Sequence, residues 1–69
     1  MEMNWENGFE ISVDITDGAA VIRANREGLI SLANHLTALA AEPAGSHFHL
    51  DGYNSLESGS AELIAEKCE

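Results

Sequence analysis

Residues 46–67, with the sequence SHFHLDGYNSLESGSAELIAEK, decide how the second half of this chain folds. They begin with alternating polar and apolar residues, the pattern of a strand with one buried face. A polar, turn-forming segment follows, and the residues from Ala61 onward predict a second strand. Phe48 and Leu50 should share the buried face, because successive side chains of a strand point in opposite directions. The opposite face would carry His47, His49 and Asp51.

The polar face of this strand has three open interpretations. Two imidazoles two residues apart can face one metal ion, and a carboxylate would add a third ligand. A structural zinc site normally takes four ligands, however, and the sequence has no paired-cysteine motif and no HExxH motif. We therefore expect no cofactor, and the face is either a contact surface for a protein partner or a solvated polar surface. The weak metal candidates are His47, His49 and Asp51.

The polar segment of residues 52–60 is long for a connection between paired strands, which usually takes about 2 to 5 residues. Tyr53 and Leu56 are expected to anchor it, while its serines and asparagine satisfy backbone groups in turns. It is either a self-packed turn or a binding loop, since tyrosine offers a large contact area at low entropic cost. As a binding loop it would present Tyr53, Asn54 and Glu57 to a partner.

The first half of the chain predicts a hairpin. Between residues 9 and 16, apolar residues alternate with polar ones, as in a half-buried strand. The Asp17-Gly18 pair suits a two-residue turn, because glycine readily takes the positive φ that such turns need. A second strand is expected over residues 19–24, with Ala20, Ile22 and Ala24 on one face.

Helical spacing begins after this hairpin. Asn25 is expected to cap the helix, and Glu27 falls in the first turn, where the helix dipole favours an anion. Pro43 and Gly45 should end the helix, since proline cannot continue it. The apolar stripe expected to pack on the sheet comprises Leu29, Leu32, Ala33, Leu36, Leu39 and Ala40. The expected outward face comprises Ser31, Asn34, His35, Thr37, Ala38 and Ala41.

The predicted element order is therefore β-β-α-β-β. Two hairpins that flank one helix predict an α+β fold of two layers, in which a mainly antiparallel four-stranded sheet carries the helix on one face. We expect a single small domain over residues 1–69, with residues 1–7 as a frayed N-terminal segment. Trp5 in this segment should either pack over one end of the core or stay exposed as an interface anchor.

The composition restricts the classes of function. Twelve acidic residues against three basic ones give a formal net charge of -9, so the negative field should repel nucleic acid and anionic membranes. The same field should attract a basic protein and speed its association. No residue is recognisable as an activated nucleophile, and an open sheet face lacks the dry pocket that catalysis favours. We therefore expect a protein that is not an enzyme.

Chain length and segment composition indicate where such a protein acts. A chain of 69 residues has a thin core, so a partner or a second copy could supply further burial, and a homo-oligomer remains open. The N-terminus lacks the basic and apolar regions of a secretory signal, and no segment approaches the roughly 20 apolar residues of a membrane span. The sole cysteine, Cys68, cannot form an intrachain disulfide. A cytoplasmic location is expected.

The run HFHLDxYNxLExGSxELI, which begins at His47, resembles immunity protein 32, a small family of predicted bacterial immunity proteins. The resemblance is densest over residues 45–67 and continues more loosely from about residue 9. It implies a protein that neutralises a cognate toxin, and the partner-binding candidates are then His47, His49, Asp51, Tyr53, Asn54 and Glu57. The alternative is a self-associating or metal-binding small domain that uses the histidine face of the same strand.

Overall fold

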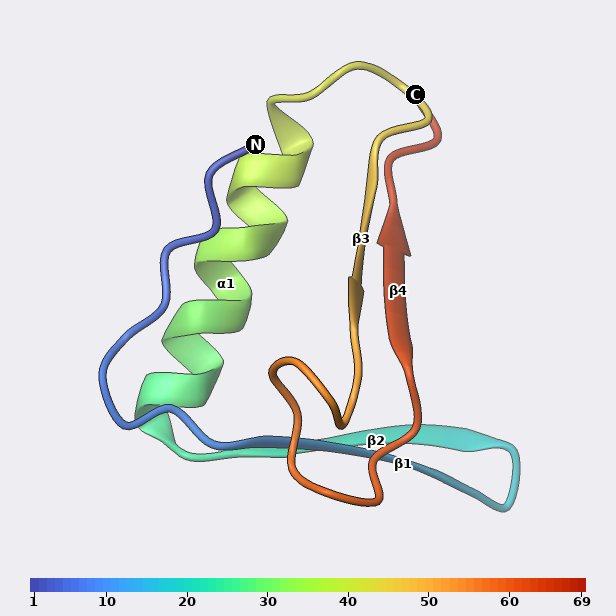
Figure 1. The fold of residues 1–69 in the computed structure, drawn as a ribbon. Helices are drawn as coiled ribbons and strands as arrows, with labels where there is room; N and C mark the ends of the chain where they lie inside the picture. Colours follow the sequence, from blue (N-terminus) through green and yellow to red (C-terminus); the bar gives the residue numbers. More distant parts are fainter.

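The structure, a computed structural model, describes residues 1–69. Its elements follow one another as a hairpin, a helix and a second hairpin, which confirms the predicted order (Figure 1). In chain order they are β1 (Ile11–Thr16), β2 (Ala19–Ala24), α1 (Arg26–Ala40), β3 (His47–Leu50) and β4 (Leu63–Glu66).

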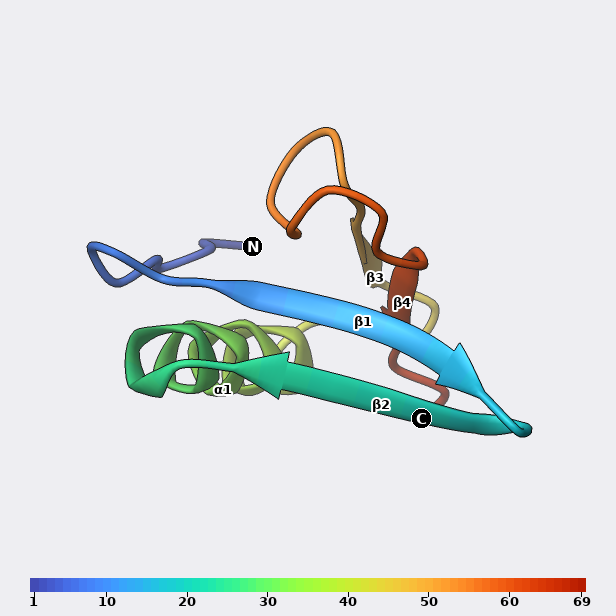
Figure 2. The same ribbon diagram turned by 90° about the horizontal axis from the view of Figure 1, so that it is seen from below.

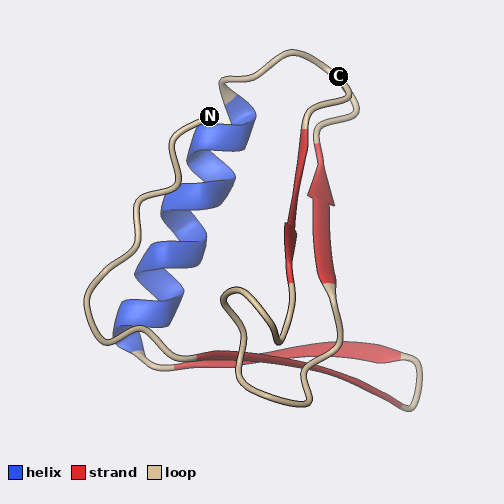
Figure 3. Ribbon diagram, viewed as in Figure 1, coloured by secondary structure: helices blue, strands red, loops and turns tan.

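The strands form two separate two-stranded antiparallel sheets, so the expected four-stranded sheet is wrong (Figure 3). In the view of Figure 1, β1 and β2 run across the lower ends of α1 and of the second hairpin. The outer edge of β1, where a third strand would pair, is taken by the loop between β3 and β4. The Ile11 carbonyl accepts a hydrogen bond from the Glu57 amide at 2.8 Å, and the Val13 carbonyl accepts one from the Ala61 amide at 2.7 Å. The loop thus satisfies the backbone groups of this edge in place of a strand.

The first hairpin follows the sequence prediction. Its turn has positive φ at both central residues, 50° at Asp17 and 78° at Gly18, as a type I′ turn requires. Val13 pairs with Ile22, and Ile11 pairs with Ala24. Directly paired residues point to the same side of a sheet, so the predicted face of Ala20, Ile22 and Ala24 is confirmed.

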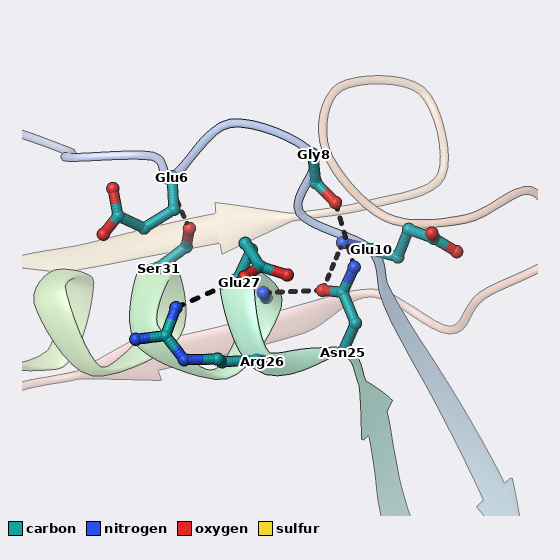
Figure 4. A network of polar contacts seen from close by, with 8 residues as sticks. Glu6, Gly8, Glu10, Asn25, Arg26, Glu27 and Ser31 are labelled. Carbon is teal, nitrogen blue, oxygen red and sulfur yellow. Dashed lines mark hydrogen bonds and ion pairs between the residues drawn. The ribbon is translucent and has the colours of Figure 1, made fainter.

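Asn25 caps the helix as predicted and also fastens the chain that leads into β1. Its Oδ1 accepts hydrogen bonds from the amides of Gly28 at 2.8 Å and Glu10 at 3.0 Å, and its Nδ2 donates to the Gly8 carbonyl at 2.9 Å (Figure 4). One side chain therefore joins the helix start to the entry of the first strand. At the other end of the helix, the Lys67 ammonium donates to the Ala40 carbonyl at 2.7 Å, where a cation complements the helix dipole.

The helix is rotated relative to the predicted orientation. Leu29 and Leu36 are 53% and 48% exposed, whereas Ser31 and His35, which were expected to face outward, are fully buried. The cause is the N-terminal segment, which runs beside α1 and covers that side of the helix (Figure 1). The buried stripe lies roughly 90° around the axis from the predicted one, at 100° per residue. It consists of Gly28, Ser31, Leu32, His35 and Leu39.

The N-terminal segment makes defined contacts with the helix and the core. The Glu6 amide donates to Ser31 Oγ at 2.8 Å, and Asn34 Nδ2 donates to the Asn4 carbonyl at 3.2 Å. Trp5 packs against the core cluster, in agreement with the first of its two alternatives. Leu56 anchors the loop, being 6% exposed, but Tyr53 is entirely exposed, so its predicted anchoring role is wrong. The buried apolar side chains are Ile11, Val13, Leu32, Leu39, Phe48, Leu50 and Leu56.

Candidate functional site

Both histidines of β3 point away from the core. Phe48 and Leu50 are 6% and 2% exposed and face inward, so the alternation predicted for this strand is confirmed. The antiparallel register places Ile64 opposite His49 and Glu66 opposite His47. We call the resulting outward surface the β3–β4 face; it consists of His47, His49, Glu62, Ile64 and Glu66.

Neighbouring groups orient the two imidazoles. His49 Nδ1 lies 3.1 Å from Glu62 Oε2, with both side chains close to half exposed. The His47 ring meets the His49 ring edge-on, with 5.0 Å between centroids. An exposed ion pair contributes only about 0 to 1 kcal/mol to folding. The Glu62 contact therefore sets the direction of the His49 ring more than it stabilises the fold.

Asp51 and Asn54 hold the start of the loop together. Asp51 Oδ1 accepts hydrogen bonds from the amides of Tyr53 at 2.9 Å and Asn54 at 3.1 Å, and Asn54 Oδ1 accepts one from the Asp51 amide at 3.1 Å. Asp51 follows the end of β3 and serves as a turn cap, so it does not continue the histidine row. The structure brings no group of three or more histidine, cysteine, aspartate or glutamate side chains together to hold a metal ion.

Tyr53 and Glu57 are two exposed residues of the loop between β3 and β4. Tyr53 is fully exposed, and the Glu57 side chain is exposed while its backbone amide binds β1. A tyrosine held out from a loop that is itself fastened to a strand is an ordered contact group with little conformational freedom to lose.

Two surface hollows adjoin the β3–β4 face. The first has a volume of about 480 Å³ and is walled mainly by apolar side chains of the N-terminal segment and β3. The second has a volume of about 440 Å³ and contains two carboxylates and several small polar residues of the loop. The first is lined by Met3, Trp5, Phe9, His49, Leu50, Asn54 and Ser55. The second is lined by Asp51, Gly52, Tyr53, Ser58, Gly59, Ser60 and Glu62.

Sequence reasoning did not connect the N-terminal segment with this site. Trp5 and Phe9 stack on each other with 4.4 Å between ring centroids, and both line the same hollow as His49. More than 30 residues separate these aromatic side chains from β3, and no short motif links them. The one signal in the sequence was Trp5 itself, a tryptophan in a largely polar segment.

His35 is a second residue whose position the sequence did not reveal. Its ring lies 4.0 Å from that of Trp5 and 5.9 Å from that of Phe48, between centroids, and neither ring nitrogen has a hydrogen-bond partner. Desolvation by burial lowers the pKa of His35 below its usual 6.5. The ring thus acts as a neutral aromatic core residue that joins the N-terminal segment to β3.

This burial predicts a pH-dependent stability. Above the unfolded-state pKa of 6.5, both states carry a neutral His35 and its contribution is complete. As pH falls below 6.5, the unfolded state binds the proton first, so stability declines until the pH reaches the folded-state pKa. The loss is at most about 1.4 kcal/mol per pH unit. Urea unfolding at pH 7.5 and 5.5 should show this decline in the natural protein and in the exposed-site variant His47→Gln, but not in His35→Leu; equal declines in all three would exclude His35 as the source.

The fold and the candidate site together define a small α+β domain that displays a polar strand face beside two hollows. The model of immunity protein 32 matches residues 20–68, more than half of the chain, and this confirms the resemblance seen in the sequence. The protein belongs to the immunity protein 32 family. No curated protein and no solved structure matches the chain. The single helix is too short and too polar to cross a membrane.

Proposed function

We propose that this protein is an immunity protein that binds a cognate bacterial toxin and neutralises it by occlusion, without a catalytic step. Membership of the immunity protein 32 family is the observation that carries the proposal. The expected setting is the cytoplasm of the cell that the protein protects.

The contact surface we propose is the β3–β4 face with the adjoining loop. Exposed apolar side chains lie among charged ones on this surface. In a complex, the apolar side chains would form the buried centre of the interface and the charged ones its polar rim. Ile64 is 52% exposed opposite His49, and Tyr53 is fully exposed and lines the same hollow as Glu62. The proposed polar contacts are His47, His49, Asp51, Asn54 and Glu57.

The net charge of -9 supports a basic surface on the toxin. Opposite fields accelerate association, and salt screens this effect over a Debye length of about 8 Å at physiological ionic strength. Association should therefore slow markedly as salt increases, while dissociation changes less.

The double variant Tyr53→Ala/Ile64→Ala should weaken toxin binding at least tenfold, because it removes the two exposed apolar groups of the proposed contact surface. The measurements are survival of cells that co-express the toxin encoded beside this gene, and calorimetric titration of the two purified proteins. Leu29→Ala/Leu36→Ala is the matched control, since it removes two exposed apolar side chains from the helix instead. If the control loses protection and the Tyr53/Ile64 variant keeps it, the proposed surface is wrong. If the natural protein does not protect, the function is wrong.

Self-association is the second candidate function, and Leu29 and Leu36 favour it. These exposed leucines lie seven residues apart, and so on one face of α1, as in helix-pairing seams. Sedimentation equilibrium should then show a dimer that the Leu29→Ala/Leu36→Ala variant dissociates, and a monomer at all concentrations would exclude this candidate.

A further inference from the structure

The two hollows beside the β3–β4 face differ in chemistry, and one side-chain contact links their linings. His49 lines the apolar hollow, and Glu62, whose carboxylate lies 3.1 Å from His49 Nδ1, lines the acidic hollow. The contact between these two side chains therefore links the lining of one hollow to the lining of the other. A ligand that filled both hollows would lie across this contact.

The apolar hollow is suited to bind one side chain of a partner. Its walls come from three separate parts of the chain: the N-terminal segment, the end of β3, and the loop. Trp5 and Phe9 form a stacked aromatic wall, and the His35 ring supports Trp5 from the protein interior. The volume of about 480 Å³ suffices for one large aromatic or aliphatic side chain, since pockets for small ligands start at about 300 Å³.

The acidic hollow has no lysine or arginine side chain to balance its carboxylates. Asp51 and Glu62 are its two charged residues. Arg26 pairs with Glu27, and the Lys67 ammonium binds the helix end at Ala40. Only the His49 ring is close to one of the carboxylates. Charge complementarity therefore favours a lysine or arginine side chain as the occupant.

We infer that the two hollows together receive one segment of a protein partner, which places a large apolar side chain in the Trp5 hollow and a neighbouring lysine or arginine in the Asp51/Glu62 hollow. This inference rests on the proposed function for the identity of the partner as a toxin. It adds the chemistry of the segment that the toxin must present.

The probes are capped peptides, Gly-Trp-Lys-Gly and Gly-Lys-Trp-Gly, titrated into the ¹⁵N-labelled protein and followed by NMR. At least one should give saturable shifts at the amides of Phe9, Leu50, Asn54 and Ser58, which lie around the two hollows. The corresponding glutamate peptides, Gly-Trp-Glu-Gly and Gly-Glu-Trp-Gly, should bind at least tenfold more weakly. Equal binding of lysine and glutamate peptides, shifts confined to α1, or no saturable shift would overturn the inference.

Two variants separate local recognition from overall charge. Glu62→Gln removes a charge from the acidic hollow and keeps an oxygen that can face His49, so it should weaken the preferred lysine peptide at least fivefold. Its control, Asp14→Asn, removes one carboxylate charge from an exposed position of β1 that lines neither hollow and lies outside the β3–β4 face, so it should change the affinity less than twofold. Equal losses in both variants would assign the effect to net charge and overturn the inference.

The apolar hollow is tested with Met3→Glu, which places a carboxylate among the hollow's apolar walls and should weaken the same peptide at least fivefold. Leu36→Glu, on the exposed side of α1, is its control. Unchanged urea midpoints show that the variants are folded. Peptide binding and protection against the toxin are separate measurements. If the protein protects cells but does not bind the peptides, the proposed function stands and only this inference is wrong.

Discussion

Replacing Gly28 with alanine should remove a large part of the stability of this domain. Alanine normally stabilises a helix by about 1 kcal/mol relative to glycine. Helix propensity alone would therefore predict that the substitution stabilises the domain. Here an added Cβ would collide with the Glu10 carbonyl oxygen and would lie 2.9 Å from Ile11 Cγ1 and 3.0 Å from Ala24 Cβ. The collision is with backbone of the chain entering β1, which Asn25 holds against the helix start. We expect a loss of about 2 kcal/mol or more, out of the roughly 3 to 5 kcal/mol that a core of this size provides.

The matched control for this substitution is Gly52→Ala. Gly52 has an ordinary φ, and an added Cβ would find its nearest atom, the Glu57 carbonyl oxygen, at 3.5 Å. Its urea midpoint should therefore stay within the equivalent of about 0.5 kcal/mol of the natural protein. Equal midpoints for Gly28→Ala and Gly52→Ala would contradict the close approach of α1 to the first hairpin.

Truncating Leu56 to alanine should have an effect of similar size. The side chain is 6% exposed in the core, and burial losses of this kind cost about 2 to 5 kcal/mol. Leu56 also anchors the loop whose Glu57 and Ala61 amides bind the edge of β1. Urea unfolding should show the stability loss, and hydrogen exchange should show selective acceleration at those two amides.

Leu36→Ala is the control for Leu56→Ala, because it removes the same atoms from a leucine that is 48% exposed. It should cost less than about 0.5 kcal/mol and leave the exchange of the loop amides unchanged. Should both leucine variants lose the same stability, the loop is not a structural part of the core.

The features that the sequence predicted correctly are those controlled by neighbouring residues. The Asp17-Gly18 turn and the Asn25 cap follow from local backbone geometry. The outward direction of His47 and His49 follows from the alternation of one strand. Each depends on side chains only a few positions apart, and the structure confirms all of them.

The features that the sequence did not reveal depend on packing between distant segments. The leucine spacing predicted the burial of Leu32 and Leu39 correctly, but it was wrong for Leu29 and Leu36. The N-terminal segment covers the side of α1 that carries Ser31 and His35 instead. The four-stranded sheet was wrong because a loop, which has no strand pattern, binds the free edge of β1 beside the second hairpin (Figure 2). Trp5 lies near β3 because the N-terminal segment packs on α1 and because the loop binds the edge of β1.

The central claim, that the β3–β4 face and its loop bind the toxin, is tested most directly by NMR cross-saturation in the complex of the two purified proteins. Saturation of toxin protons should reduce the amide signals of residues 47–66 and leave the exposed side of α1, around Leu29 and Leu36, unaffected. Signal loss concentrated on α1 or on the β1–β2 turn, with none at His49, Tyr53 or Ile64, would contradict the account.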